Sequence, residues 1–404
     1  MKALLLTNEY PPYIYGGAGV HVEYLTGELS RLIDVEVRCF GDQKLSKKTA
    51  KPQIALDVAG YCHDMTLFNK TDKKLSPAFE ALYKNILFNV EPIDADLVHC
   101  HTWYTHMGGI IAKKSYGIPL VITTHSLEPL RPWKREQLGH GYDLSVWIEK
   151  TALEMADTVI AVSQGMKSDI VKLFDIDSEK IKVIYNGIDT NEFKKTLNPE
   201  ILVKHEIDPN TPYVLFVGRI TRQKGIIHLV NAVKYINPDV QIVLCAGLPD
   251  TKEIGQEMKA GVDALRRKNV IWLQKMLPRE ELIILYSHAT VFCCPSIYEP
   301  FGIINLEALA CSTPVVASAV GGIVEIVNHG VNGLLVEFEQ HNESPFEAVN
   351  PEQFSKDLAT SINRILNDST LRNNMGQAGR ETAVEKFSWK NIAVSVVELY
   401  KTLV

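Results

Sequence analysis

The sequence predicts an α/β protein made of two doubly wound parallel sheets. Short, almost wholly apolar runs alternate with amphipathic helical segments, which is typical of parallel strands covered by helices on both faces. The 404 residues exceed what one ordinary hydrophobic core accommodates. The alternation stops in a polar stretch near residue 190 and starts again at Tyr213. We therefore expect two domains of similar construction.

The composition is that of a soluble globular protein, with 46% hydrophobic and 22% charged residues. A net charge of −6 argues against a nucleic-acid partner, which would call for a basic domain. Lys2 is followed by only four apolar residues, too few for a signal peptide, and no apolar run is long enough to span a membrane. Seven cysteines without metal-ligand spacing favour reduced thiols. These features predict a cytoplasmic protein.

The first half opens with a strand at 2–7, a glycine-rich turn at 16–19 and a helix from about Val20 to Leu32. This order places backbone N–H groups over an anion, but a tight turn without a ligand fits the pattern equally well. The glycines do not have the spacing of the dinucleotide fingerprint. The remaining pattern predicts strands at 34–40, 96–101, 119–124, 158–163 and 181–185, helices at 77–89 and 143–156, and a solvated loop at 41–51.

Four residues lie at or beyond the carboxyl ends of these strands, namely Glu9, Gly16, His101 and His125. Ligands of doubly wound sheets bind beyond the carboxyl ends of the strands, so we expect His125 to serve a site there. The alternative is a hydrogen-bonded histidine with no further role. The segment 126–135 carries three cations among prolines and a tryptophan. It is predicted to bind a phosphate or a sugar, unless it is only a solvated basic loop.

The second half begins with a strand at 213–217, a turn holding Arg219 and Lys224, and a helix from about Ile226. Two cations at the end of a strand are suited to a diphosphate. A hairpin-type turn is predicted at Asn332-Gly333. Further strands are expected at 240–246, 270–273, 289–294 and 313–318, and helices at 353–368, at 370–385 and from about 389.

The stretch 295–310 carries the most specific signal. Glu299 and Glu307 flank a turn between a buried strand and a helix that starts near Gly302 or Ile303. The N-terminus of a helix binds phosphate, whereas carboxylates accept hydrogen bonds from hydroxyl groups. A phosphate-binding turn between two hydroxyl-binding carboxylates predicts a sugar-nucleotide site.

Along nearly its whole length the chain resembles the retaining glycosyltransferases of family four. Within that family it is most similar to actinobacterial-type glycogen synthases, also described as α-maltose-1-phosphate synthases. The resemblance implies the GT-B architecture, two Rossmann-like domains that face across a cleft and close on substrate. It implies domains at 1–189 and 190–388, with a helix at about 389–404 that crosses back to the first. The motifs that carry it are Asn8–Pro12 with Tyr15–Gly19, His125–Lys134, Gly218-Arg219 with Lys224-Gly225, and the Glu299–Glu307 pair.

The resemblance also implies roles for the matching residues. Arg219 and Lys224 hold the donor diphosphate, Glu299 meets hydroxyls of the transferred sugar, and His125 contacts that sugar near the reacting centre. These four are the expected catalytic residues. The remaining donor contacts are expected from Gly16 and Gly17 at the diphosphate, Phe301, Gly302 and Ile303 beside Glu299, and Glu307 at the ribose. The acceptor is expected to meet Glu9, Tyr15, His101, Arg131, Trp133 and Lys134.

The expected reaction moves glucose from ADP-glucose to glucose 1-phosphate, or to an α-1,4-glucan end. No metal or other cofactor is expected, because the two cations take that part; loss of activity on chelation with rescue by Mg²⁺ would contradict this. A UDP-sugar transferase with a lipid or small-metabolite acceptor, a sugar-nucleotide epimerase and a non-catalytic binding protein are the alternatives. The absence of a basic amphipathic helix argues against the lipid acceptor, and the segment from Leu130 to Lys134 argues against the epimerase.

Overall fold

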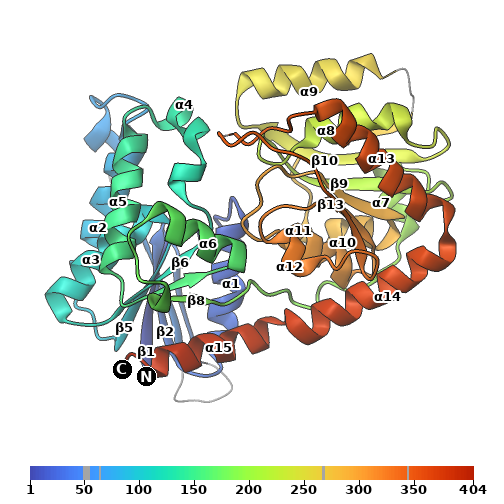
Figure 1. Ribbon diagram of the computed structural model, residues 1–404. Helices are drawn as coiled ribbons and strands as arrows, with labels where there is room; N and C mark the ends of the chain where they lie inside the picture. The colour runs from blue at the N-terminus through green and yellow to red at the C-terminus, as the bar shows by residue number, and fades with distance from the viewer. Residues whose placement is uncertain (49–54, 63–64, 266–268, 344) are drawn as a thin grey trace. The chain divides into compact units, whose positions relative to one another are not determined.

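The computed structural model describes residues 1–48, 55–62, 65–265, 269–343 and 345–404. The chain forms two compact units, Met1–Gly187 together with Trp389–Val404, and Ile188–Ser388 (Figure 1). Within the described ranges, no helix has both the length and the apolar character needed to cross a membrane.

The first unit is built on an eight-stranded sheet with the order β3-β4-β2-β1-β5-β6-β7-β8. From β4 to β7 this is the 3-2-1-4-5-6 order of a dinucleotide-binding fold, with the order reversing between β1 and β5. The strands are β1 (Lys2–Thr7), β2 (Asp34–Phe40), β3 (Lys44–Lys48), β4 (Ala55–Tyr61), β5 (Leu97–His101), β6 (Leu120–Thr124), β7 (Thr158–Ala161) and β8 (Ile181–Val183).

The prediction of a loop at 41–51 is wrong over β3. Lys44 to Lys48 pair antiparallel with Ala59 to Ala55 of β4, a strand that the sequence analysis also missed. Leu56 and Val58 of β4 are buried, so β4 belongs to the sheet and offers an edge to its neighbour. A lysine-rich strand suits such an edge because its charges discourage pairing with another chain. Residues 49–51 of the predicted loop lie outside the described residues.

Helices cover both faces of the first sheet. Leu5 of β1 and Val22 of α1 share one hydrophobic cluster with Ile392 and Val396 of α15, while α2, α3 and α5 pack together elsewhere in the unit. The residues after 389 therefore complete the core of the first unit. The helices are α1 (Gly17–Leu29), α2 (Ser76–Leu87), α3 (Trp103–Tyr116), α4 (Arg135–Leu138), α5 (Gly141–Met155), α6 (Gln164–Leu173) and α15 (Trp389–Lys401).

The second unit repeats the 3-2-1-4-5-6 order in a six-stranded sheet, β11-β10-β9-β12-β13-β14, whose strand pairs are all parallel. The order reverses between β9 and β12. The expectation of two Rossmann-like sheets is thus confirmed. The strands are β9 (Tyr213–Ile220), β10 (Gln241–Pro249), β11 (Val270–Leu273), β12 (Val291–Cys294), β13 (Val315–Ser318) and β14 (Gly333–Val336).

The hairpin predicted at Asn332-Gly333 is wrong. Gly333 opens β14, which runs parallel to β13, so the chain between them is a crossover. The Asn332 side chain is buried, accepts a hydrogen bond from the backbone of Asn328 and donates one to the carbonyl of Ile326. Asn332 therefore closes a loop after a short helix instead of forming the two-residue turn of a hairpin.

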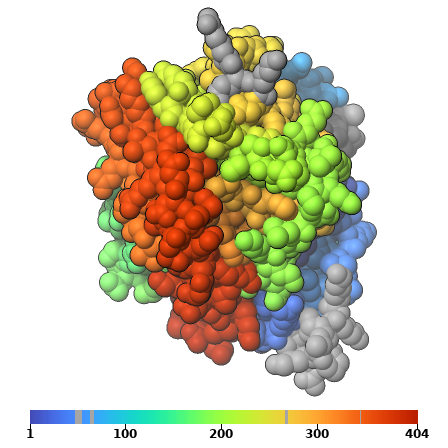
Figure 2. Space-filling view, turned by 90° about the vertical axis from the view of Figure 1, so that its right-hand side faces the viewer, coloured from blue at the N-terminus to red at the C-terminus, as the bar shows by residue number. Residues whose placement is uncertain are grey.

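The helices of the second unit also pack on its sheet. Leu229 of α8 and Phe354 of α13 share a cluster with Leu244 of β10, and Figure 2 shows α13 and α14 in orange-red at the surface. The helices are α7 (Pro199–Lys204), α8 (Ile226–Ala232), α9 (Lys252–Ala264), α10 (Arg279–His288), α11 (Ile303–Ala310), α12 (Ile323–Ile326), α13 (Pro351–Asn367) and α14 (Ser369–Lys386).

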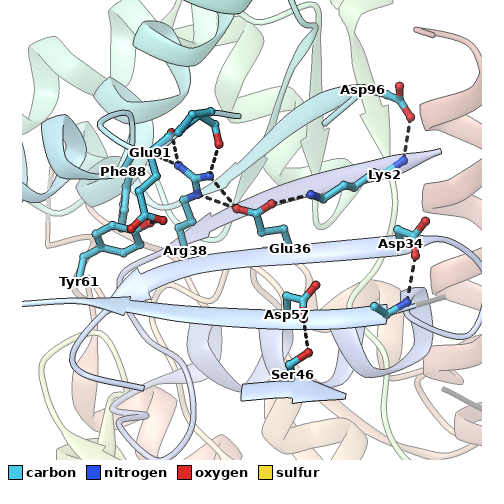
Figure 3. A network of polar contacts seen from close by, with 12 residues as sticks. Lys2, Asp34, Glu36, Arg38, Ser46, Asp57, Tyr61, Phe88, Glu91 and Asp96 are labelled. Carbon is cyan, nitrogen blue, oxygen red and sulfur yellow. Dashed lines mark hydrogen bonds and ion pairs between the residues drawn. The ribbon is translucent and has the colours of Figure 1, made fainter. Parts of the chain in front are cut away.

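A buried arginine ties β2 of the first unit to the loop after α2 (Figure 3). Arg38 is 2% exposed and donates to the carbonyls of Phe88, Glu91 (3.1 Å) and Pro92 (3.0 Å). Its guanidinium also lies 2.8 Å from Glu36, whose second oxygen is 2.9 Å from the Lys2 ammonium. Arg38 thus supplies the donor for three backbone carbonyls of this loop, and of these three residues Phe88 is fully buried.

Replacing Arg38 with methionine is expected to lower the free energy of unfolding by about 3 kcal/mol, because three carbonyls lose their donor and Glu36 loses its ion pair with Arg38. Arg31→Met is the control, since Arg31 is 68% exposed and its ion pair with Glu28 is at the surface. Urea denaturation of both variants checks the difference, and equal stability of the two would contradict it.

Candidate active site

Lys224 and Glu299 meet where the strand order of the second sheet reverses. Lys224 follows β9 and Glu299 follows β12, and the ammonium lies 2.6 Å from Glu299 Oε2. Ser296 donates a hydrogen bond of 3.2 Å to the same oxygen. The Glu299 side chain is only 8% exposed. In doubly wound sheets this reversal is where ligands bind. The structure therefore brings two predicted site residues, 75 positions apart, into one ion pair.

Three glycines allow the loops around this pair to come together. A Cβ on Gly225, whose φ is +59°, would lie 2.0 Å from the Pro295 carbonyl oxygen. A Cβ on Gly321, whose φ is +51°, would lie 2.1 Å from the carbonyl oxygen of Glu299. Gly302 precedes α11 with a φ of +102°. Only glycine adopts these conformations without strain and leaves room for the neighbouring backbone.

The helix α11 begins at Ile303, as predicted, so the first-turn amides of Ile303 and Ile304 lie beside the Glu299 loop. Amides at this position have no partner within the helix and attract anions. Phe301 is buried and packs against Phe387 at a ring distance of 6.0 Å. Its side chain therefore anchors the loop, and only its backbone remains a candidate for ligand contact.

Arg219, near the end of β9, donates a hydrogen bond of 3.0 Å to Asp250. Asp250 directly follows β10 and was missed by the sequence analysis. The rule that ligand-site residues follow parallel strands could have found it. Asp250 orients the guanidinium, which is 32% exposed and remains accessible to a ligand.

The Glu307 carboxylate lies within α11 and accepts a hydrogen bond of 2.8 Å from the Tyr286 hydroxyl. Burial raises the pKa of Glu307 to about 7, although the hydrogen bond from Tyr286 and the charges of Arg279 and Lys224 oppose the shift. Glu307 therefore changes charge near neutral pH, which ordinary glutamates do not do.

In the first unit, Glu9 shapes the glycine-rich turn that follows β1. Its Oε2 accepts hydrogen bonds of 2.8 Å from the backbone amides of both Tyr15 and Gly16. A Cβ on Gly19 would lie 2.8 Å from the Glu9 side chain. Gly17 is the first residue of α1, which starts three residues earlier than predicted because extended Gly16 serves as its N-cap. The Tyr15 side chain is exposed.

His101 and His125 come together at the ends of β5 and β6, with His101 Nδ1 3.1 Å from His125 Nε2. His21 of α1 joins them, its ring centre 4.6 Å from that of His125. Burial lowers the pKa of His101 and of His125 well below the ordinary value, and lowers the pKa of His21 to about 4. His21 was missed because, inside an amphipathic helix, it reads as an ordinary polar position.

The segment after His125 forms two 3-10 turns, Glu128–Leu130 and Pro132–Lys134. Lys134 is 8% exposed, and its ammonium lies 3.1 Å from the buried carboxylate of Glu128. Arg131 donates to Ser126 at 3.1 Å and lies 3.6 Å from the same carboxylate. Trp133 between them is half-buried. Lys134 therefore neutralises Glu128 inside the unit, and Arg131 is the more accessible of the two cations.

Known proteins resemble both halves of this chain. The family profile described as glycosyltransferase family 4 matches residues 15–192, and the one described as glycosyl transferases group 1 matches residues 198–382. The alpha-maltose-1-phosphate synthase of Mycolicibacterium smegmatis is 44% identical over 99% of both chains. This chain belongs to glycosyltransferase family 4.

A second relative agrees with the family assignment, and a solved structure agrees with the fold. The alpha-maltose-1-phosphate synthase of Mycobacterium tuberculosis is 41% identical to this family 4 chain, again over 99% of both. The solved structure of a sucrose-phosphate synthase from Thermosynechococcus elongatus superposes with a TM-score of 0.75 at 24% identity, covering 100% of this chain and 99% of that one. The predicted family and its GT-B class of fold are thereby confirmed.

Proposed function

We propose that this glycosyltransferase moves glucose from ADP-glucose to glucose 1-phosphate with retention of the α configuration, forming maltose 1-phosphate. The observation that carries the proposal is the identity of 41–44%, over 99% of both chains, to proteins named for that product. The end of an α-1,4-glucan is the second acceptor, because the motifs around His125 and Glu299 are also those of glycogen synthases.

Lys224, Arg219 and the first amides of α11 are proposed to hold the donor diphosphate. As the bond from C1 of glucose to the phosphate oxygen breaks, negative charge grows on the leaving group. Cations and amides fixed in advance stabilise that charge without further rearrangement. The departing phosphate then takes the proton of the acceptor hydroxyl, and the new bond to C1 forms on the same face.

The remaining contacts are proposed from the roles of matching residues. Glu299 accepts hydrogen bonds from the hydroxyls of glucose, Gly16 and Gly17 approach the diphosphate, and His125 contacts the glucose. Glu307 accepts hydrogen bonds from the ribose. Tyr286 donates its hydrogen bond to Glu307 Oε2, so we propose that Oε1 is the oxygen that meets the ribose.

Acceptor contacts are proposed for Glu9, Tyr15, His101, Arg131 and Trp133. For Lys134 a direct contact would require release from Glu128, so we propose that it acts by fixing the turn that carries Arg131. The cytoplasm is proposed as the site of the reaction because the sequence, with seven cysteines that lack metal-ligand spacing, favours reduced thiols.

Product analysis tests the proposed reaction. Purified protein is incubated with ADP-glucose or UDP-glucose, each with glucose 1-phosphate or glycogen, and the products are separated. Maltose 1-phosphate from ADP-glucose is the expected major product. If glycogen were extended and no maltose 1-phosphate formed, the acceptor would be the glucan and not glucose 1-phosphate. An isomerised nucleotide sugar as the product would contradict glycosyl transfer by this chain.

The value of kcat/KM for the donor is expected to fall about tenfold per pH unit below pH 7, because it reports the ionisation of the free enzyme. The protonated Glu307, whose pKa is about 7, cannot accept two hydrogen bonds from the ribose. In the Glu307→Gln variant kcat/KM should be low at every pH and should not fall further below pH 7. If kcat/KM of the variant still fell tenfold per pH unit below pH 7, the titration would belong to another group.

Arg131→Ala is expected to raise the KM for glucose 1-phosphate about tenfold or more while leaving the KM for glycogen nearly unchanged, because a charged hydrogen bond to phosphate contributes about 1.5–3 kcal/mol. Arg135→Ala is the matched control, since Arg135 lies in the same segment but pairs with Asp143 at the surface. Equal effects on both acceptors would refute a phosphate contact.

A further inference from the structure

Three histidines of the first unit form a group of metal-ligand type. His21 lies on α1, His101 ends β5 and His125 follows β6, and one ring nitrogen of each lies within 4.8 Å of the other two. Three elements that are far apart in sequence thus deliver imidazoles to one point. His21 and His101 are buried, while His125 is partly exposed and leaves a route from solvent.

The contact between His101 and His125 has the dimensions of a ligand pair. Their facing nitrogens are 3.1 Å apart. Two imidazole nitrogens bound to tetrahedral Zn²⁺ at 2.0–2.1 Å would be about 3.3 Å apart. The two nitrogens are thus already at the spacing of two ligands, and both rings would turn toward an ion as it replaces the hydrogen between them.

The third histidine is held with a nitrogen available. His21 Nδ1 lies 2.7 Å from Asn186 Oδ1, so Nδ1 carries the hydrogen and Nε2 presents its lone pair. Over the described ranges, His21 Nε2 is buried with no hydrogen-bond partner. The ring also packs edge-on against Trp389 at 5.1 Å. A ligating histidine usually has such an outer partner, which fixes its tautomer and orientation.

The geometry points to a Zn²⁺ site at His21, His101 and His125; we propose that this chain binds one Zn²⁺ there and that the ion inhibits glucosyl transfer. Three imidazoles favour Zn²⁺ and related transition ions over Mg²⁺ or Ca²⁺, which prefer oxygen ligands. Inhibition rests on the proposed function, because an ion that holds His125 withdraws it from the glucose. The ion is thus a regulator and not a requirement of the reaction.

Calorimetry with Zn²⁺ and visible absorption with Co²⁺ test the site in the full chain. One equivalent of Zn²⁺ is expected to bind, to displace tetrahedral Co²⁺ and to raise the Tm, since it binds the folded state. His21→Gln and His101→Gln should each weaken binding at least about tenfold, and Asn186→Ala about tenfold through the orientation of His21. Binding at exposed sites only, unaffected by these substitutions, would overturn the proposal.

His106→Gln is the matched control, because His106 is another buried histidine of the first unit but lies outside the group. It should leave the affinity for Zn²⁺ unchanged. The Asn186→Ala variant keeps all three ligands, so it tests the site even if a histidine variant fails to fold. A Zn²⁺ affinity that is equal in the Asn186→Ala variant and the wild type would count against the site.

Activity in buffered Zn²⁺, with reversal by a chelator, separates the two proposals. Loss and recovery of glucosyl transfer support both. If Zn²⁺ bound but activity stayed full, the metal site would stand and the contact of His125 with glucose would be refuted. If the His125→Ala variant lost activity and the wild type bound no Zn²⁺, the contact of His125 with glucose would stand and the metal site would be refuted.

Discussion

Lys224→Ala is expected to lower kcat about 10²- to 10³-fold, the loss found when one preorganised donor to a developing negative charge is removed. The ammonium lies 2.6 Å from Glu299 and is held in place before any donor arrives. Its loss removes the charge proposed to stabilise the departing phosphate, and Glu299 keeps its hydrogen bond from Ser296 but loses its ion pair. Initial rates at saturating donor and acceptor measure the effect.

Arg222→Ala is the control for Lys224, because it removes the same charge from the same turn, where Arg222 is 45% exposed and lies near Glu257 and Glu347. Its kcat should stay close to that of the wild type. A double-mutant cycle sharpens the test. Lys224 and Glu299 are in contact, so the loss in Lys224→Ala with Glu299→Gln should be smaller than the sum of the single losses. Strict additivity would show that the ion pair does not act as a unit.

Gly225→Ala is expected to lower the free energy of unfolding of the second unit by about 3 kcal/mol. The left-handed conformation at φ +59° costs a residue with a Cβ roughly 1–2 kcal/mol. The new methyl group would also lie 2.0 Å from the Pro295 carbonyl oxygen, and relieving such a clash costs about 1–3 kcal/mol. Urea denaturation of the variant and the wild type measures the difference.

Gly330→Ala separates the two contributions. Gly330 also has a positive φ, +80°, but an added Cβ would meet no atom within 4 Å. This variant should therefore lose only the conformational part, roughly 1–2 kcal/mol. If both variants lost the same stability, the close approach of the Gly225 and Pro295 loops would contribute nothing. Since that approach joins the turns that carry Lys224 and Glu299, Gly225→Ala should also reduce activity.

The sheets could largely be predicted because parallel strands buried on both faces are continuous apolar runs, as at Leu4 to Leu6 and Val214 to Val217. The edge could not. The segment from Lys44 to Lys48 contains three lysines and lacks an apolar run, and its pairing partners lie 7 to 15 residues further along the chain. The start of a helix was predictable where the backbone needs a glycine, as at Gly302 before α11. The start of α1 was harder to predict, because Gly16 is extended and is not distinguishable from a loop residue in the sequence.

Residue types at strand ends predicted Arg219, Lys224, Glu299 and His125, but not what each would contact. The partners Asp250 and Tyr286 are ordinary residues until the fold places them beside Arg219 and Glu307. Lys134 shows the converse. A lysine among prolines looks exposed in the sequence, yet the buried Glu128 draws it inward. Such contacts join separate segments of the chain, so the sequence pattern of either segment alone does not predict them.

The helix α15 has a consequence for how the chain is made. Trp389 packs against His21, and the Tyr400 hydroxyl lies 2.6 Å from His99 in the first sheet. On the ribosome, residues 1–187 emerge without these contacts and wait while Ile188–Ser388 is synthesised, about 10–40 s at bacterial and eukaryotic rates. The second unit can therefore finish folding first, and the apolar side chains that α15 covers, among them Leu5 and Val22, stay exposed to water or to a chaperone until α15 arrives.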